Sequence, residues 1–182
     1  MALLIFQILS SVFGFANKLF LFLGKRAGWM LGFLAGIFFV IYFLLIGFTI
    51  YAVVQIGFSF LMLYGYFSHK AISKNARIVA TILLSLIAIG ITFITFKGGL
   101  TLLEAVSALL ASWGTYFLAS KNNMKGWSAF LIAHLILIYL TAIKQQYIAA
   151  VFQALSAGVS IMGIMKQSKI NTGRKLLEGL EL

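Results

Sequence analysis

Few side chains in this sequence could carry out catalysis or bind a metal. The 182 residues include no Cys and no Asp, and the acidic residues are Glu104, Glu178 and Glu181 alone. Metal centres are built from clustered Cys, His, Asp or Glu ligands, and the sequence offers no such cluster. We therefore predict that the chain is not an enzyme, has no catalytic residues, and uses no metal and no cofactor.

Three polar side chains interrupt long apolar runs. Gln55 and Gln153 each lie about a third of the way into a run, and His134 lies near the middle of another. A polar group in lipid costs free energy unless it has a partner or faces a cavity. The two amides could therefore hold helices together, or they could bind a carboxamide or hydroxyl group of a ligand. His134 is open to the same two interpretations, and to a dyad with a serine of another run, namely Ser107, Ser112 or Ser160.

Aromatic residues precede His134 at helical spacing. Trp127, Phe130 and His134 stand at i, i+3 and i+7, which places them on one face of a helix. Three flat side chains on one face could stack on a planar ligand, or they could pack in a core. Trp29 begins an earlier apolar run and is expected in the aromatic belt at the membrane surface.

The composition places these residues in a membrane. Hydrophobic residues make up 63% of the chain and charged residues 9%, whereas a soluble domain carries about 25% charged residues. The sequence therefore predicts an all-α polytopic membrane protein with seven transmembrane helices and no sizeable domain outside the membrane. The predicted helices lie at 2–23, 27–46, 48–68, 77–96, 100–119, 126–143 and 146–166, with the least marked boundary at Ile46–Thr49.

The basic residues predict an orientation. Of the 14 Lys and Arg, eleven lie after the first, third and fifth predicted helices or in the C-terminal tail, and only Lys97 and Lys144 lie on the opposite side. The positive-inside rule then places the N-terminus outside and the C-terminus in the cytoplasm. The net charge of +11 therefore reflects orientation, and we expect no nucleic-acid partner. Lys18, near the cytoplasmic end of the first helix, is expected to snorkel to the interface, and the basic tail to lie near anionic lipid.

The sequence contains a weak internal repeat. A shift of 98 residues aligns Gly28-Trp29 with Gly126-Trp127, Ala35 with Ala133, Ala52-Val53-x-Gln55 with Ala150-Val151-x-Gln153, and Gly65 with Gly163. The shift crosses four helices and so preserves direction, which predicts two parallel three-helix bundles joined by a linking helix. We expect the first bundle at 1–69, the linking helix at 70–97, the second bundle at 98–167 and a basic cytoplasmic tail at 168–182. In transporters of this sugar-facilitator-like (SWEET-like) arrangement the ligand lies between the bundles near the midplane.

One acidic residue falls inside a predicted membrane helix. Glu104 lies near the outer end of the fifth helix, and at that depth we expect its carboxylate to reach water. No deeper carboxylate is available to bind Na⁺ or to carry H⁺. The sequence therefore favours uncoupled, downhill transport over ion-coupled transport.

The order of these motifs resembles the PnuC-type transporters, a family that takes up nicotinamide riboside and related B-vitamin precursors. The likeness runs from about Gly24 to Lys166. It rests on Trp127, Phe130, His134, Lys144 and Tyr147 in the second repeat, and on Lys25–Trp29, Gln55 and Tyr64-Gly65-Tyr66 in the first. The chain departs from the family where Phe130 replaces a second Trp, where His134 replaces an Asp, and where Tyr66 replaces a common Trp.

The resemblance implies a homotrimer in the bacterial inner membrane and a small planar substrate. The residues that it implies for binding are Trp127, Phe130, His134, Gln55, Gln153 and Tyr64. Together with the features above, it predicts facilitated uptake of a ring-bearing vitamin precursor, first of all nicotinamide riboside, by alternating access. Facilitators for a thiamine-like vitamin or a sugar, and a non-transporting membrane scaffold, are the alternatives that the sequence leaves open.

Overall fold

The computed structural model describes residues 1–67, 74–95, 98–119 and 122–178 of the chain. Within these ranges the secondary structure is entirely helical, as predicted. The helices are α1 (Ala2–Phe22), α2 (Ala27–Leu45), α3 (Thr49–Phe67), α4 (Lys74–Thr95), α5 (Gly99–Ala119), α6 (Asn123–Ile143) and α7 (Tyr147–Glu178). These bounds agree with the seven predicted helices to within a few residues, except at the end of α7.

Five of the helices are long and apolar enough to cross a membrane: α1, α2, α5, α6 and α7. In α3 and α4 the described apolar stretches cover Thr49–Phe60 and Thr81–Ile94. Large apolar side chains lie exposed on the outside of the bundle, among them Leu86, Phe93 and Ile94 of α4. Such a surface is stable in lipid and would be costly in water.

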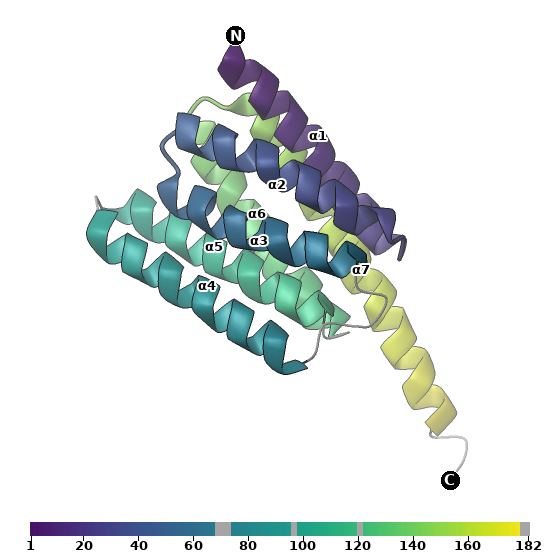
Figure 1. The fold of residues 1–182 in the computed structure, drawn as a ribbon. Helices are drawn as coiled ribbons and strands as arrows, with labels where there is room; N and C mark the ends of the chain where they lie inside the picture. The colour runs from purple at the N-terminus through teal and green to yellow at the C-terminus, as the bar shows by residue number, and fades with distance from the viewer. Residues whose placement is uncertain (68–73, 96–97, 120–121, 179–182) are drawn as a thin grey trace.

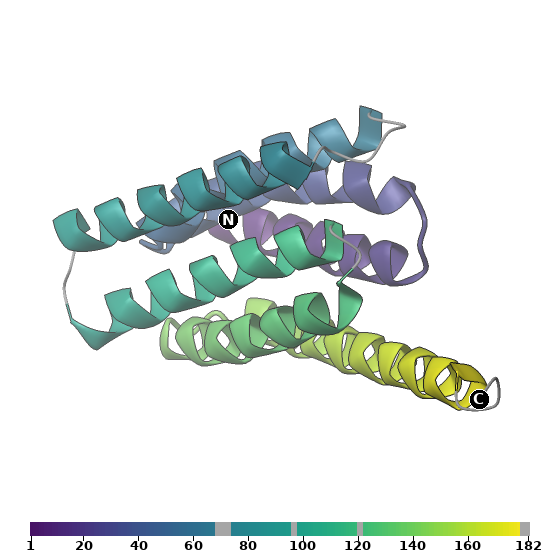
Figure 2. The same ribbon diagram turned by 90° about the horizontal axis from the view of Figure 1, so that it is seen from below.

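Six helices form a closed ring, and α4 lies outside it. Going round the ring, α1 packs on α2, α2 on α3, α3 on α5, α5 on α6, α6 on α7, and α7 returns to α1. Among the described residues α4 packs against α3 and α5 only, and Figure 1 shows it at the edge of the bundle. The view in Figure 2 shows the same layering, with α3 and α4 on one side and α6 and α7 on the other.

The turn between α2 and α3 lies where the sequence predicted it. Gly47 has φ +77°, a conformation that glycine adopts without steric cost, and the amide of Phe48 donates to the carbonyl of Phe43 over 2.8 Å. The turn between α6 and α7 has the same form: Gln145 has φ +57°, and the amide of Gln146 donates to the carbonyl of Thr141 over 2.8 Å. The two turns are 98 residues apart, which is the spacing of the sequence repeat.

The last helix is longer than predicted. We expected the seventh membrane helix to end at residue 166, but α7 continues without a break to Glu178. Figure 1 shows its C-terminal part projecting beyond the rest of the bundle. Basic residues from Lys166 onward mark where the chain leaves the apolar layer. No Pro or Gly lies at positions 166–172 to end the helix there. The predicted tail at 168–182 therefore begins inside a helix.

Candidate functional site

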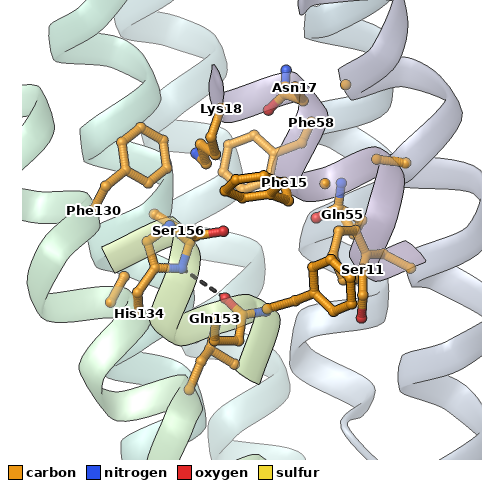
Figure 3. A pocket seen from close by; sticks show the side chains of 18 of the residues that line it. Ser11, Phe15, Asn17, Lys18, Gln55, Phe58, Phe130, His134, Gln153 and Ser156 are labelled. Atoms are coloured by element: carbon orange, nitrogen blue, oxygen red, sulfur yellow. Dashed lines mark hydrogen bonds between the residues drawn. The ribbon is translucent and has the colours of Figure 1, made fainter. Parts of the chain in front are cut away.

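A central cavity lies inside the ring of helices. It has a volume of about 100 Å³, and all six ring helices contribute to its wall. Its lining is largely apolar, with phenylalanine side chains such as Phe15 and Phe58 at its centre in Figure 3. The polar and charged side chains in the wall are those of Ser11, Asn17, Lys18, Tyr51, Gln55, Thr115, His134, Gln153 and Ser156.

Equivalent positions of the two sequence repeats meet in this wall. Gln55 of α3 and Gln153 of α7, which the repeat aligns, both line the cavity from different sides of the ring. The same holds for Ala35 and Ala133. Four further pairs at the same spacing of 98 residues line it with unlike side chains: Asn17 with Thr115, Gly32 with Phe130, Phe39 with Leu137, and Phe58 with Ser156. The cavity thus lies where the two repeats face each other, and its chemistry differs between the two halves.

His134 and Gln153 form a buried hydrogen-bonded pair. His134 Nδ1 lies 2.7 Å from Gln153 Oε1, shown by the dashed line in Figure 3. Because an amide oxygen can only accept, the imidazole donates through Nδ1, and Nε2 is then an acceptor. Nε2 is buried and has no hydrogen-bond partner among the described residues. The pair therefore links α6 to α7 and leaves one acceptor and the Gln153 NH₂ group for other bonds.

The serine–histidine dyad that the sequence left open is not formed. The hydroxyl groups of Ser107, Ser112 and Ser160 each donate to a backbone carbonyl of their own helix, over 2.7, 2.9 and 3.0 Å. The described residues also contain no group of three or more His, Cys, Asp and Glu that could hold a metal ion.

The predicted aromatic stripe on α6 joins the central cavity to a second one. The ring centroids of Trp127 and Phe130 lie 6.4 Å apart, and those of Phe130 and His134 lie 6.0 Å apart with nearly parallel planes. Phe130 and His134 line the central cavity, whereas Trp127 lines the second cavity. Trp127 is only 6% exposed, and it fits tightly because the residue of α7 beside it is Gly163.

The second cavity is the larger, with a volume of about 480 Å³. It lies at the basic end of the bundle, where Lys25, Arg26 and Lys166 contribute to its wall together with Trp29 and Trp127. Met62, Thr115 and Phe130 line both cavities and so form the partition between them. The two cavities therefore adjoin each other at these three side chains.

Lys18 does not lie where the sequence predicted it. We expected it to snorkel to the interface, but its side chain is 9% exposed and lines the central cavity, with Nζ 3.0 Å from the centroid of the Phe130 ring. The reason is the face of α1 on which it lies. The buried residues of this helix are polar, namely Gln7, Ser10, Ser11, Asn17 and Lys18, whereas Leu4, Ile5, Ile8 and Val12 are exposed. The spacing of these polar residues is that of one helical face, a signal in the sequence that we did not use.

Glu104 is a second correction. We expected its carboxylate to reach water, but the residue is 6% exposed and its Oε1 accepts a hydrogen bond of 3.0 Å from the backbone amide of Tyr51. Tyr51 belongs to the first turn of α3, where amides lack partners within the helix. Glu104 therefore caps α3 from α5, and it does not line the central cavity. Of the other predicted site residues, Tyr64 lies on α3, and its side chain is outside the described part of the structure.

The chain matches the sequence model of a known protein family. The sequence model of the family described as Nicotinamide mononucleotide transporter matches residues 4–169. This segment contains every described residue that lines the central cavity. The curated proteins and the solved structures give no match.

Proposed function

The chain belongs to the nicotinamide mononucleotide transporter family, and from this membership and the central cavity we propose that it takes up a small ring-bearing vitamin precursor by uncoupled transport. The membership confirms the resemblance to PnuC-type proteins and supports a membrane transporter for nicotinamide-related compounds. Nicotinamide riboside is the first substrate that we propose to test. The observation that carries the proposal is that the equivalent residues Gln55 and Gln153 both line a largely apolar cavity between the helices.

We further propose that the ring consists of two parallel three-helix bundles, α1–α3 and α5–α7, with α4 as the link. The helix contacts support this arrangement. If α1, α2 and α3 are exchanged with α5, α6 and α7, the pattern of helix contacts stays the same. The contact of α1 with α7 corresponds to that of α5 with α3, and each contact within the first bundle corresponds to one within the second. The identical turns at Gly47 and Gln145 support it too. Alternating access would then come from one bundle rocking against the other around the cavity.

The proposed site uses the groups that face the cavity. Gln55 and Gln153 each carry an amide that can donate and accept, which suits the carboxamide or hydroxyl groups of the ligand. His134 Nε2 supplies a further acceptor, and Phe130 supplies an aromatic surface for a planar ring. Trp127 lies on the far side of the partition, where it would contact the ligand on its way to the basic end.

The central cavity is too small for such a ligand as it stands. Sites for small molecules usually have volumes of about 300–1,000 Å³, well above the 100 Å³ found here. The adjoining cavity of about 480 Å³ supplies the missing space once the partition at Met62, Thr115 and Phe130 moves. We propose that this movement opens the site toward the basic end, which the positive-inside rule assigns to the cytoplasm.

The remaining features of the proposal come from the sequence. The family resemblance suggests a homotrimer in the bacterial inner membrane, with the N-terminus outside and the C-terminus inside. Uncoupled transport is supported by the position of Glu104, the only acidic residue in α1–α6, whose carboxylate caps α3 and is absent from the cavity wall. Enzymatic activity is not part of the proposal.

The test is uptake of labelled nicotinamide riboside by cells that express Gln55→Ala, Gln153→Ala or Trp127→Ala. Each glutamine variant removes hydrogen bonds worth about 1–2 kcal/mol, which weakens binding roughly five- to thirty-fold. Gln146→Ala is the matched control, because this glutamine lies in the α6–α7 turn and its side chain donates to the carbonyl of Lys144, away from the cavity wall. Uptake at the wild-type rate in all three variants, at normal expression, would contradict the site.

A binding assay, combined with uptake, separates the alternatives. A thermal-shift panel with nicotinamide riboside, thiamine and simple sugars would distinguish a vitamin transporter from a sugar facilitator of the same fold. A scaffold protein would show no uptake and no stabilisation by any of them. These outcomes would replace the proposed substrate without changing the assignment to the family.

A further inference from the structure

The cavity wall contains one charged side chain that the proposed site has not used. Lys18 comes from α1 and points toward Phe130 in Figure 3. Its ammonium nitrogen lies 3.0 Å from the centroid of that ring, and the side chain is more than nine-tenths buried. No hydrogen bond or ion pair to Lys18 is formed by any described residue.

No carboxylate of the described residues balances this lysine. The residues that line the cavity with it carry hydroxyl, amide and imidazole groups, and none is acidic. Glu104, the only acid in α1–α6, is bound to the amide of Tyr51 on another side of the ring. The aromatic face of Phe130 offers about 0.5–2 kcal/mol to a cation, less than the several kcal/mol that burial of an ion costs.

The wall of the same cavity also carries neutral hydrogen-bond donors. Ser11 lies two turns earlier on α1, and Gln55 and Ser156 come from α3 and α7. The side chains of these three residues form no hydrogen bond to another described residue, so their donors can turn toward a ligand. A lysine that shares a cavity with hydroxyl and amide donors provides a donor set that can bind carboxylate or phosphate oxygens.

We propose that Lys18 is an anion-binding subsite of the central cavity, which selects nicotinamide-related ligands that carry a carboxylate or phosphate. This inference rests on the proposed function and narrows its substrate class. The pyridinium ring of nicotinamide riboside is cationic and carries no anionic group, so Lys18 repels it and gains nothing in return. The corresponding acid, nicotinic acid riboside, adds a carboxylate at almost the same size. The mononucleotide adds a phosphate at the other end.

The experiment measures the affinity of the purified full-length protein in lipid nanodiscs for these three compounds. In the wild type, the acid riboside or the mononucleotide is expected to bind at least ten-fold more tightly than nicotinamide riboside. Preference for the acid riboside identifies the carboxylate as the bound group, and preference for the mononucleotide identifies the phosphate. Lys18→Gln is expected to reduce this preference to about one, and Lys18→Arg to retain most of it.

Two features keep the result interpretable. The readout is a ratio of affinities within one preparation, so a smaller folded fraction does not change it. Lys125→Gln is the matched control, because Lys125 is exposed at the start of α6 and should leave the preference intact.

Three outcomes would overturn the inference. In the first, the wild type binds nicotinamide riboside more tightly than both anionic compounds. The proposed function would be retained in that case. The second is an anion preference that Lys18→Gln leaves unchanged. The third is a wild type without an anion preference, together with tighter binding of nicotinamide riboside to Lys18→Gln than to the wild type. Lys18 would then only cover the face of the Phe130 ring. Failure of all three compounds to bind the wild type would instead refute the proposed function, and the subsite with it.

Discussion

The bond between Glu104 and the amide of Tyr51 allows a test that separates a structural acid from a coupling acid. Glu104 is the only acidic residue in α1–α6, so an ion-coupled mechanism that uses a carboxylate inside these helices would have to use it. In the structure it is buried and accepts a hydrogen bond of 3.0 Å from the first turn of α3. Replacement by Ala should therefore lower stability, while the rate of uptake per folded molecule should remain.

The size of the effect follows from the bond that is lost. A hydrogen bond to a charged group contributes about 1.5–3 kcal/mol, and removal of a helix cap costs about 0.5–2 kcal/mol. Glu104→Ala leaves the Tyr51 amide without a partner in an apolar region, so we expect a loss of about 2–3 kcal/mol. Glu104→Gln keeps an acceptor but loses the negative charge beside the helix N-terminus, so about 1 kcal/mol is expected. For a chain of this length these losses lower Tm by about 4–12 °C and about 2–4 °C.

The assay is thermal unfolding of the purified protein in detergent, combined with uptake corrected for the folded fraction. Ser112→Ala is the control on the same helix, because its buried hydroxyl only donates to the carbonyl of Ala108 and should matter little. The reasoning is refuted if Glu104→Gln unfolds like the wild type but loses uptake. That pattern would make Glu104 a coupling residue and would end the proposal of uncoupled transport.

Two further predictions concern packing and coupling. Gly163→Ala should lower stability by about 1–3 kcal/mol, because its methyl group would lie 2.5 Å from ring carbons of Trp127; Gly158→Ala on the same helix meets nothing within 4 Å and should stabilise by up to about 1 kcal/mol. Equal melting temperatures for both variants would show that Trp127 is not tightly packed. Uptake of labelled substrate should persist when an uncoupler collapses the proton gradient, and loss of uptake under that treatment would require a coupled mechanism.

The fold was largely predictable because helix boundaries in a membrane depend on local features. Apolar runs of about 20 residues have to be helical in lipid, where every backbone amide needs a partner. The turn at Gly47 could be located inside an uncharged run, since the repeat aligned it with the polar turn at Gln145. The end of α7 could not be located in this way, because leaving the membrane does not end a helix. Its last residues keep their helical hydrogen bonds beyond the apolar layer.

The site was predicted less well than the fold, and the errors have one cause. Depth along a helix can be read from residue number, whereas the direction of a side chain depends on which face the neighbouring helices cover. Lys18 lies near a helix end and was expected at the interface, but it shares its face with Ser11, and that face turns toward the cavity. Glu104 was judged by depth in the same way. Its partner is an amide of α3 that is 53 residues away in the sequence, so no local pattern points to it.

The repeat also shows how a nearly symmetric scaffold can hold a ligand in a single orientation. Gln55 and Gln153 are equivalent and alike, so the two proposed bundles would offer the same amide contacts from both sides of the cavity. Other equivalent positions are unlike: Phe130 corresponds to Gly32, and both line the cavity, whereas Lys18 corresponds to Tyr116, which does not line it. The Phe130 ring of α6 thus has no aromatic counterpart at the equivalent position of α2, and the Lys18 charge of α1 has no counterpart in α5. Rotation of the scaffold by half a turn would place each glutamine amide on its equivalent. It would place neither the Phe130 ring nor the Lys18 charge on an equivalent group. A ligand with an aromatic ring and an anionic group should therefore bind in one direction only.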